Sequence, residues 1–251
     1  MADALRLYGL KAIVMAGASG ISEAIVRTLV KHGASVLALD TQDSGVDSVY
    51  KSVRGATGKA LDANSDDIGS AAVEVAKQEL GGIDIVFNYL ELPQESPIND
   101  ADTEALENIL SARSVIYESV ARATLPFLMK SPAGRLISVG FVRSVFGIDG
   151  EAAFEKSRVV LSDFSKKFAA ENGEYGISAN YIQPGAVMTP ESRKVFSGAT
   201  DLRDFCIRRS AARRIGESVD IAKVALFLAT DDAVFVSGTG IIVDGGRADP
   251  S

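Results

Sequence analysis

Cysteine and histidine, the side chains most often used as nucleophiles, proton carriers or zinc ligands, occur once each in this chain, as Cys206 and His32. A single cysteine cannot form an internal disulfide, and a zinc site takes about four ligands at regular spacing. His32 stands between Lys31 and Gly33, a pattern typical of a helix end, where an imidazolium is favourable. The sequence therefore predicts no metal site and no catalytic role for His32.

Adjacent carboxylates are the next groups that could do acid–base or metal chemistry. They occur as Asp66-Asp67 and Asp231-Asp232. Both pairs fall near the expected ends of helices, where aspartate caps backbone N–H groups or faces solvent. We interpret them as capping or solvated residues.

The composition of the chain limits the classes of protein that it fits. With 251 residues, of which 47% are hydrophobic, one sizeable core can form, and we expect a single domain over residues 1–251. A net charge of −7 repels a phosphate backbone, so nucleic acid is not an expected partner. No apolar run reaches the roughly 18 residues of a membrane span, and residues 1–3 lack the basic start of a signal peptide. We expect a cytoplasmic protein with no membrane partner.

Short apolar runs alternate along the chain with segments of helical length. Two long helical segments, 102–130 and 149–172, flank one of these runs. Alternating strands and helices indicate βαβ units. The pattern predicts an α/β fold, a Rossmann-like doubly wound parallel sheet with helices on both faces. The expected strands include residues 12–15, 35–39, 83–87, 135–139 and 177–182.

Several blocks resemble the short-chain dehydrogenase/reductase family in order and spacing. Residues 11–21 (KAIVMAGASGI) resemble its first strand and glycine turn, and 175–180 (YGISAN) and 184–189 (PGAVMT) resemble its sixth strand and the loop after it. Residues 236–240 (VSGTG) and 243–246 (VDGG) resemble its last strand and C-terminal segment. The resemblance covers nearly the whole chain. It implies the family's Rossmann-like fold and nicotinamide dinucleotide chemistry.

The family's cofactor turn is altered here. In the family it reads Thr-Gly-x-x-x-Gly-x-Gly and wraps the dinucleotide pyrophosphate at a helix N-terminus. Residues 17–22 (GASGIS) are one residue short, and Ser22 stands where the last glycine would be. In residues 88–91 (NYLE), Glu91 falls where the family has Asn-Asn-Ala-Gly, so that its carboxylate repels cofactor phosphates. We therefore expect no cofactor in this chain.

Four positions keep residues that the resemblance connects with the cofactor: Asp40, Asp62, Asn88 and Thr189. Asp40 matches the acid that accepts hydrogen bonds from the adenine ribose in NAD-preferring members, and Thr189 matches a threonine near nicotinamide. Structural explanations exist as well, because Asp40 ends a strand and Thr189 precedes Pro190 at a helix start. Both interpretations stay open, and we class the four as vestigial candidates.

The resemblance also implies a catalytic Asn, Ser, Tyr and Lys, and all four positions are changed. Arg113, Phe141, Phe154 and Arg158 occupy them, placed by the family's spacing from Pro126 and residues 134–137. The change to Phe154 matters most, because it removes the hydroxyl of an acid–base catalyst worth about 10² to 10⁴ in rate. We predict no catalytic residue in this chain.

Neighbouring side chains are poor substitutes for the missing ones. Lys156 lies two positions after Phe154, about 200° around a helix, and so faces elsewhere. Ser138 and Ser144 are the two hydroxyls close in sequence to Phe141, one in a strand and one in a loop.

The pattern of losses resembles the inactive subunit of heteromeric family members such as 2-[hydroxy(phenyl)methyl]succinyl-CoA dehydrogenase. Our leading hypothesis is a pseudoenzyme that assembles with an active subunit of the family in an NAD-dependent hydroxyacyl or alcohol dehydrogenase complex, with NAD in the partner. One alternative is a regulatory homo-oligomer that binds a nucleotide or metabolite. Another is a non-redox enzyme related to halohydrin dehalogenases, which Arg158 fits but the loss of Ser and Tyr does not.

Overall fold

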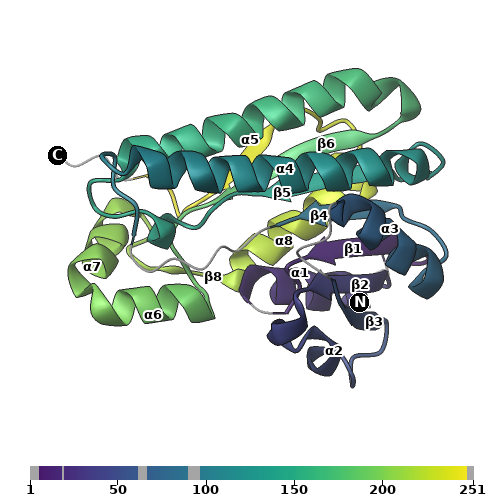
Figure 1. The fold of residues 1–251 in the computed structure, drawn as a ribbon, viewed down its shortest axis with the longest axis horizontal. Coiled ribbons are helices and arrows are strands. Elements are labelled where there is room, and N and C mark those ends of the chain that lie inside the picture. Colours follow the sequence, from purple (N-terminus) through teal and green to yellow (C-terminus); the bar gives the residue numbers. More distant parts are fainter. Residues whose placement is uncertain (1–5, 19, 62–66, 90–96, 248–251) are drawn as a thin grey trace.

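The structure, a computed structural model, describes residues 6–18, 20–61, 67–89 and 97–247. Seven parallel strands form one sheet in the order β3-β2-β1-β4-β5-β6-β9 (Figure 1). Strand order reverses between β1 and β4, which is the doubly wound arrangement. The strands are β1 (Lys11–Met15), β2 (Ser35–Asp40), β3 (Ala56–Ala60), β4 (Ile85–Asn88), β5 (Arg135–Val139), β6 (Ser178–Pro184) and β9 (Gly240–Val243).

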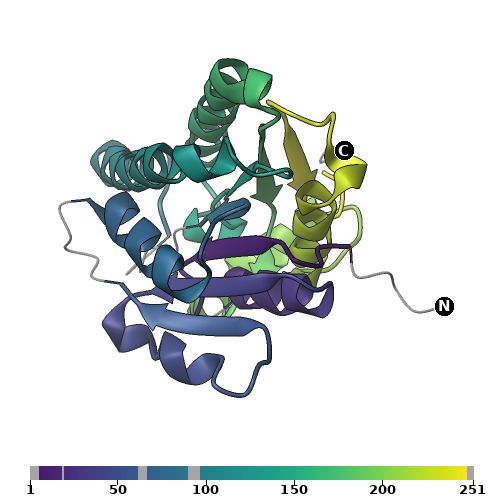
Figure 2. The same cartoon turned by 90° about the vertical axis from the view of Figure 1, so that its right-hand side faces the viewer.

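Helices cover both faces of this sheet (Figure 2). On one face α1 (Gly20–Lys31) packs against α8 (Ser218–Ala229), and on the other α3 (Ile68–Glu79) packs against α4 (Thr103–Leu128), which is followed by α5 (Glu151–Asn172). The side chains of β1 alternate between two hydrophobic cores, one on each face of the sheet. Ala12 and Val14 belong to the core under α1 and α8, and Ile13 and Met15 belong to the core under α3 and α4. Because both faces are buried, successive residues of β1 are apolar instead of alternating with polar ones.

Short elements gather at the carboxyl ends of the strands. The 3₁₀ turn η2 (Arg143–Val145) follows β5 and contacts α6 (Pro190–Gly198) and α7 (Thr200–Arg209). Strand β7 (Val187–Met188) pairs in parallel with β8 (Gly216–Glu217). The 3₁₀ turn η1 (Gln42–Ser44) and the helix α2 (Val46–Val49) follow β2. These pieces shape the region where ligands bind in open α/β sheets. Two further 3₁₀ turns, η3 (Gly173–Tyr175) before β6 and η4 (Asp231–Ala233) before β9, lie at the amino ends of the strands.

The predicted doubly wound parallel sheet is confirmed. The expected strand 83–87 begins two residues later, because Asp84 lies in the preceding connection, where its carboxylate accepts hydrogen bonds from Lys11 N and Ser131 Oγ. The expected helices 102–130 and 149–172 are α4 and α5, each slightly shorter. Among the described residues, no helix combines the length and the apolar character that crossing a membrane requires.

Candidate active site

The glycine turn between β1 and α1 is held by contacts with Ser22, Ala38 and Tyr50. Ser22 is buried, and its Oγ donates to the Met15 carbonyl oxygen at 3.1 Å, so that a side chain does enter between helix and strand as predicted. A Cβ on Gly17 would lie 2.7 Å from Ala38 Cβ, which explains why only glycine fits there. The Tyr50 hydroxyl donates to the Gly17 carbonyl oxygen. The turn is therefore packed against β2 and fixed.

Asp40 binds this turn through its carboxylate. One oxygen accepts a hydrogen bond from Ala18 N at 2.8 Å, and the other accepts one from Thr41 N at the same distance. The carboxylate thus closes the end of β2 onto the turn, in line with the structural interpretation of Asp40. The Ala18 N–H and the Ser22 side chain are thus both engaged in contacts within the protein.

The other vestigial candidates also have structural roles where they are described. Asn88 is buried and its Nδ2 donates to the Tyr117 carbonyl oxygen at 3.3 Å. Thr189 caps α6, because its Oγ1 accepts from Ser192 N at 3.1 Å while Ser192 Oγ accepts from Thr189 N at 2.7 Å. Asp62 and Glu91 lie outside the described residues. The helix-start interpretation of Thr189 is confirmed.

Three phenylalanines, Phe141, Phe146 and Phe154, form a continuous contact that we call the aromatic row. Ring centroids of Phe141 and Phe146 are 6.1 Å apart, and those of Phe146 and Phe154 are 5.5 Å apart, both in edge-to-face geometry. At one end, Arg113 is buried with its guanidinium Cζ 3.2 Å from the Phe141 ring centroid. Burial lowers the pKa of Arg113. The row is a packed apolar unit with a cation stacked on its end.

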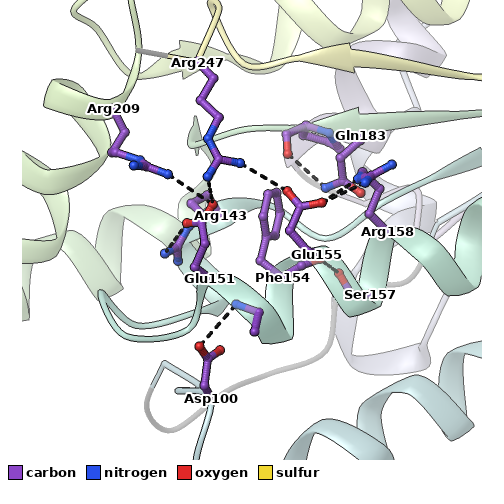
Figure 3. Close-up of polar contacts among 12 residues, drawn as sticks. Asp100, Arg143, Glu151, Phe154, Glu155, Ser157, Arg158, Gln183, Arg209 and Arg247 are labelled. Atoms are coloured by element: carbon purple, nitrogen blue, oxygen red, sulfur yellow. Dashed lines mark hydrogen bonds and ion pairs between the residues drawn. The ribbon is translucent and has the colours of Figure 1, made fainter. Parts of the chain in front are cut away.

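Three arginines from distant segments, Arg143, Arg209 and Arg247, converge on Glu151 at the start of α5, and we call these three the arginine cluster (Figure 3). Their nitrogens lie 3.6, 3.2 and 2.8 Å from Glu151 oxygens, in that order. Arg143 is almost fully buried, and its Nη1 donates to the Phe146 carbonyl oxygen at 2.8 Å. Burial lowers the pKa of Arg143.

Arg158 lies beside the arginine cluster. It pairs with Glu155 at 2.8 Å, and Glu155 also lies 3.5 Å from Arg247 (Figure 3). The hydrogen bond with Glu155 raises the pKa of Arg158, and a second one with Tyr181 adds to this. A cavity of about 150 Å³ opens here between Phe154, Phe205 and the arginine cluster.

A larger cavity, of about 620 Å³, runs between residues 113–125 of α4 and 157–172 of α5. We call it the α4–α5 groove. Its lining combines apolar side chains with charges of both signs. Arg122 and Lys167 are exposed within it.

A family profile and individual relatives relate this chain to the same group of proteins. The sequence profile of a family described as Enoyl-(Acyl carrier protein) reductase matches residues 15–248. The chain belongs to the short-chain dehydrogenase/reductase family. It is 29% identical to the 3-oxoacyl-[acyl-carrier-protein] reductase FabG of Escherichia coli (strain K12), over 96% of this chain and 98% of that protein. It is 27% identical to the protein of the same name from Thermotoga maritima, over 96% and 99% of the two chains. It is 31% identical to (+)-borneol dehydrogenase 2 of Salvia officinalis, over 96% and 90%.

The structure places the four substituted family positions in two groups. Arg113 stacks on Phe141, and Phe154 joins Phe141 through Phe146, so these three share one apolar unit. Arg158 lies apart from it, one helical turn beyond Phe154, and is paired with Glu155. The arrangement of these groups provides no hydroxyl at positions 141 or 154. That the chain has no catalytic residue stays a prediction.

The neighbouring groups considered as substitutes lie in different surroundings. Lys156 is exposed and pairs with Glu107, so the prediction that it faces away is confirmed. Ser138 is fully buried within β5, where its Oγ makes no hydrogen bond among the described residues, and Ser144 is buried in η2.

Where the structure describes them, the paired acids are capping or exposed residues and His32 lies at a helix end, as predicted. Asp67 is the N-cap of α3 and accepts from Ser70 N, while Asp66 lies outside the described residues. Asp231 and Asp232 are exposed and pair with Arg135 and Arg6. His32 follows the last residue of α1. Within the described ranges, no group of three or more His, Cys, Asp or Glu side chains could hold a metal ion.

Sequence reasoning missed the arginine cluster and its acceptor Glu151. Their segments are remote in the chain, and only the fold brings η2, α5, α7 and the residues after β9 together. A signal existed in the arginine-rich stretch 203–214 (RDFCIRRSAARR), which holds five arginines. Without a known neighbour, such a stretch is normally interpreted as solvated surface.

Proposed function

We propose that this chain is a catalytically inactive, cytoplasmic subunit that assembles with an active member of its family in an NAD-dependent hydroxyacyl or alcohol dehydrogenase complex. The observation that carries the proposal is the aromatic row. Phe141 and Phe154 occupy the positions of the family's Ser and Tyr and are packed with Phe146. Neither can transfer a proton or bind a developing oxyanion.

The cofactor side supports the same proposal. Asp40 bonds the Ala18 N–H, and the Ser22 side chain lies between α1 and β1. Both contacts use groups that a pyrophosphate would need, as free N–H donors or as open space. The chain itself therefore takes no dinucleotide under this proposal, and NAD belongs to the partner's site.

The α4–α5 groove supports assembly. It lies on the two longest helices of the described chain and carries charges of both signs, including Glu118 and Arg122 on α4 and Asp163 and Lys167 on α5. A surface with both signs on adjacent helices can pair with a related surface turned by a two-fold rotation, provided that the axis brings positive residues of one helix opposite negative residues of the other. The occupant that we propose is the corresponding helix pair of an active subunit.

The chemical class of the complex is supported by the named relatives. Two are named as 3-oxoacyl reductases and one as a borneol dehydrogenase, so all three names describe the interconversion of a hydroxyl and a carbonyl. The halohydrin dehalogenase alternative is less well supported, because Arg158 is paired with Glu155.

The test of assembly is purification of the tagged chain from its own cells, with native mass spectrometry of the product. We expect a stable complex containing a second family member with the Asn, Ser, Tyr and Lys intact. Lys167→Glu reverses a charge in the groove and should reduce co-purification at least tenfold. Lys166→Glu makes the same change on the adjacent exposed residue outside the groove and should leave it unchanged.

The test of catalytic roles uses the reconstituted complex. Replacing the partner's catalytic Tyr with Phe should abolish NAD-dependent oxidation, whereas substitutions at Phe154 should leave the partner's turnover per active site unchanged. A chain that purifies only as a homo-oligomer, or that alone reduces a carbonyl with NADH, would overturn the proposal. A homo-oligomer that binds NADH in calorimetry would favour the regulatory alternative.

A further inference from the structure

The cavity beside the arginine cluster has more positive than negative charge. The three arginines of the cluster share Glu151, and Arg158 and Arg247 share Glu155 (Figure 3). Four guanidinium groups therefore meet two carboxylates. A third lining carboxylate, Asp244, accepts from Gly246 N, and a fifth lining arginine, Arg214, is paired with Asp220. The local charge is opposite in sign to the net charge of −7 of the whole chain.

One of these guanidinium groups has an unsatisfied donor. Arg143 Nη2 is buried and makes no hydrogen bond within the described part of the chain, because Glu151 Oε2 lies at 3.6 Å, beyond hydrogen-bond distance. The Arg143 side chain is only 8% exposed and lines the cavity. A buried N–H donor without a hydrogen-bond acceptor is costly even beside an ion-pair partner, and a bound acceptor would reduce that cost.

Apolar side chains also line the cavity. They include Phe154, Phe205 and Ile242, and the Arg143 guanidinium lies 5.7 Å from the Phe154 ring centroid and 5.4 Å from that of Phe205. The cavity volume of about 150 Å³ admits a small organic molecule but is too small for a dinucleotide.

We infer that this cavity is a binding site for a small organic carboxylate. Its carboxylate bonds Arg143 and Arg209 in place of, or beside, Glu151, and its short apolar body lies against Phe154 and Phe205. Guanidinium groups can form paired hydrogen bonds with planar carboxylates. The contacts with Glu151 are not of this paired kind, since Arg209 and Arg247 each approach its Oε1 through a single nitrogen. The site needs neither catalysis nor a dinucleotide, and so it is independent of the proposed function.

Butyrate is a suitable probe, because it combines one carboxylate with a short apolar chain. Binding to the isolated full-length chain is measured by ligand-observed NMR titration, alongside the neutral isostere butyramide and inorganic phosphate. We expect saturable binding of butyrate, with butyramide and phosphate each at least tenfold weaker. Phosphate is the control for a general anion site. Such a site would bind phosphate about as well as butyrate, whereas the proposed site should prefer the ligand with an apolar chain.

The matched variants are Arg209→Gln and Arg203→Gln, both on α7. Arg209 lines the cavity and pairs with Glu151, whereas Arg203 pairs with Asp204 on the outside of the helix. Arg209→Gln should weaken butyrate at least tenfold, the usual loss for a charge-assisted hydrogen bond, and Arg203→Gln should change it less than twofold. Equal thermal midpoints verify folding. Absent butyrate binding, tighter phosphate binding or equal losses in both variants would overturn the inference.

Discussion

The guanidinium Cζ of Arg113 lies 3.2 Å from the centroid of the Phe141 ring, and both side chains are buried. Arg113→Ala removes this stack and leaves a cavity, so it should lower the free energy of unfolding by about 2 to 4 kcal/mol. Arg113→Met keeps most of the volume and removes a buried charge, so it should cost at least about 1 kcal/mol less. Urea unfolding measures both. Equal losses would show that the charge itself, rather than packing, supports this region.

Phe154→Tyr alone should not produce a reductase. The new hydroxyl would lie near the Phe146 ring and the Arg143 guanidinium, with Arg158 held by Glu155 instead of a lysine beside it. The Ser equivalent at Phe141 is also missing. We expect no carbonyl reduction with NADH above background in a spectrophotometric assay. Measurable turnover by this single variant would mean that the turn does bind the cofactor.

The Tyr50 hydroxyl should contribute to the stability of the glycine turn. It donates to the Gly17 carbonyl oxygen, and burial raises the pKa of Tyr50 above its usual value. Tyr50→Phe leaves that carbonyl without its donor and should cost about 1 to 2 kcal/mol in chemical unfolding. Tyr8 is 79% exposed, and Tyr8→Phe is the control that should have no effect. A silent Tyr50→Phe would show that the turn is fixed by Ser22 and Asp40 alone.

Asp67 should make stability depend on pH in the acid range. Hydrogen bonds from Ser119 first, and then from Ser70, lower the pKa of Asp67 from its usual 3.8 to about 2. A folded-state pKa below the unfolded one means that the stabilisation is complete above pH 4 and is lost as the pH falls toward 2. Carboxyl NMR titration should give a midpoint near 2. A midpoint at 3.8 or higher would contradict the contact with Ser119.

Cys206 should react slowly with thiol reagents while the chain is folded. Burial raises the pKa of Cys206 to about 11, so that at pH 8 only about one thiol in a thousand is ionised. Labelling with a disulfide reagent should therefore be slow in buffer and complete within the mixing time in denaturant. Rapid labelling of the native protein would show that α7 opens readily.

The sheet was predictable because β1, β2, β4, β5 and β6 are apolar runs bounded by helical patterns. The pair β7–β8 was not, since each strand has two residues, too few for any period to be visible. In the site, the positions of Phe141 and Phe154 follow from spacing within one continuous segment. The contact that joins them, through Phe146, depends on how η2 folds back against α5, which no local pattern specifies.

Asp40 shows the same limit for a polar residue. Its position at the end of β2 was predictable, but the sequence left two explanations of its role open. Only the distances to Ala18 N and Thr41 N show that the carboxylate is turned toward the chain's own backbone. The arginine cluster lay beyond sequence reasoning for a related reason. Charged side chains have no periodic signature, and their partners come from segments that meet only in the folded protein.

If the chain is the inactive subunit proposed above, the aromatic row also limits the routes by which it could become active. A Ser in place of the buried Phe141 would leave a cavity against the Phe146 ring, at a cost of about 3 to 5 kcal/mol. A Tyr in place of the half-buried Phe154 would change stability less. No rate would be gained in return while the other positions stay changed. Under the proposed function, a stepwise return to activity would thus start without any gain in rate, and through Phe141 with a loss of stability, so that the change would be hard to reverse.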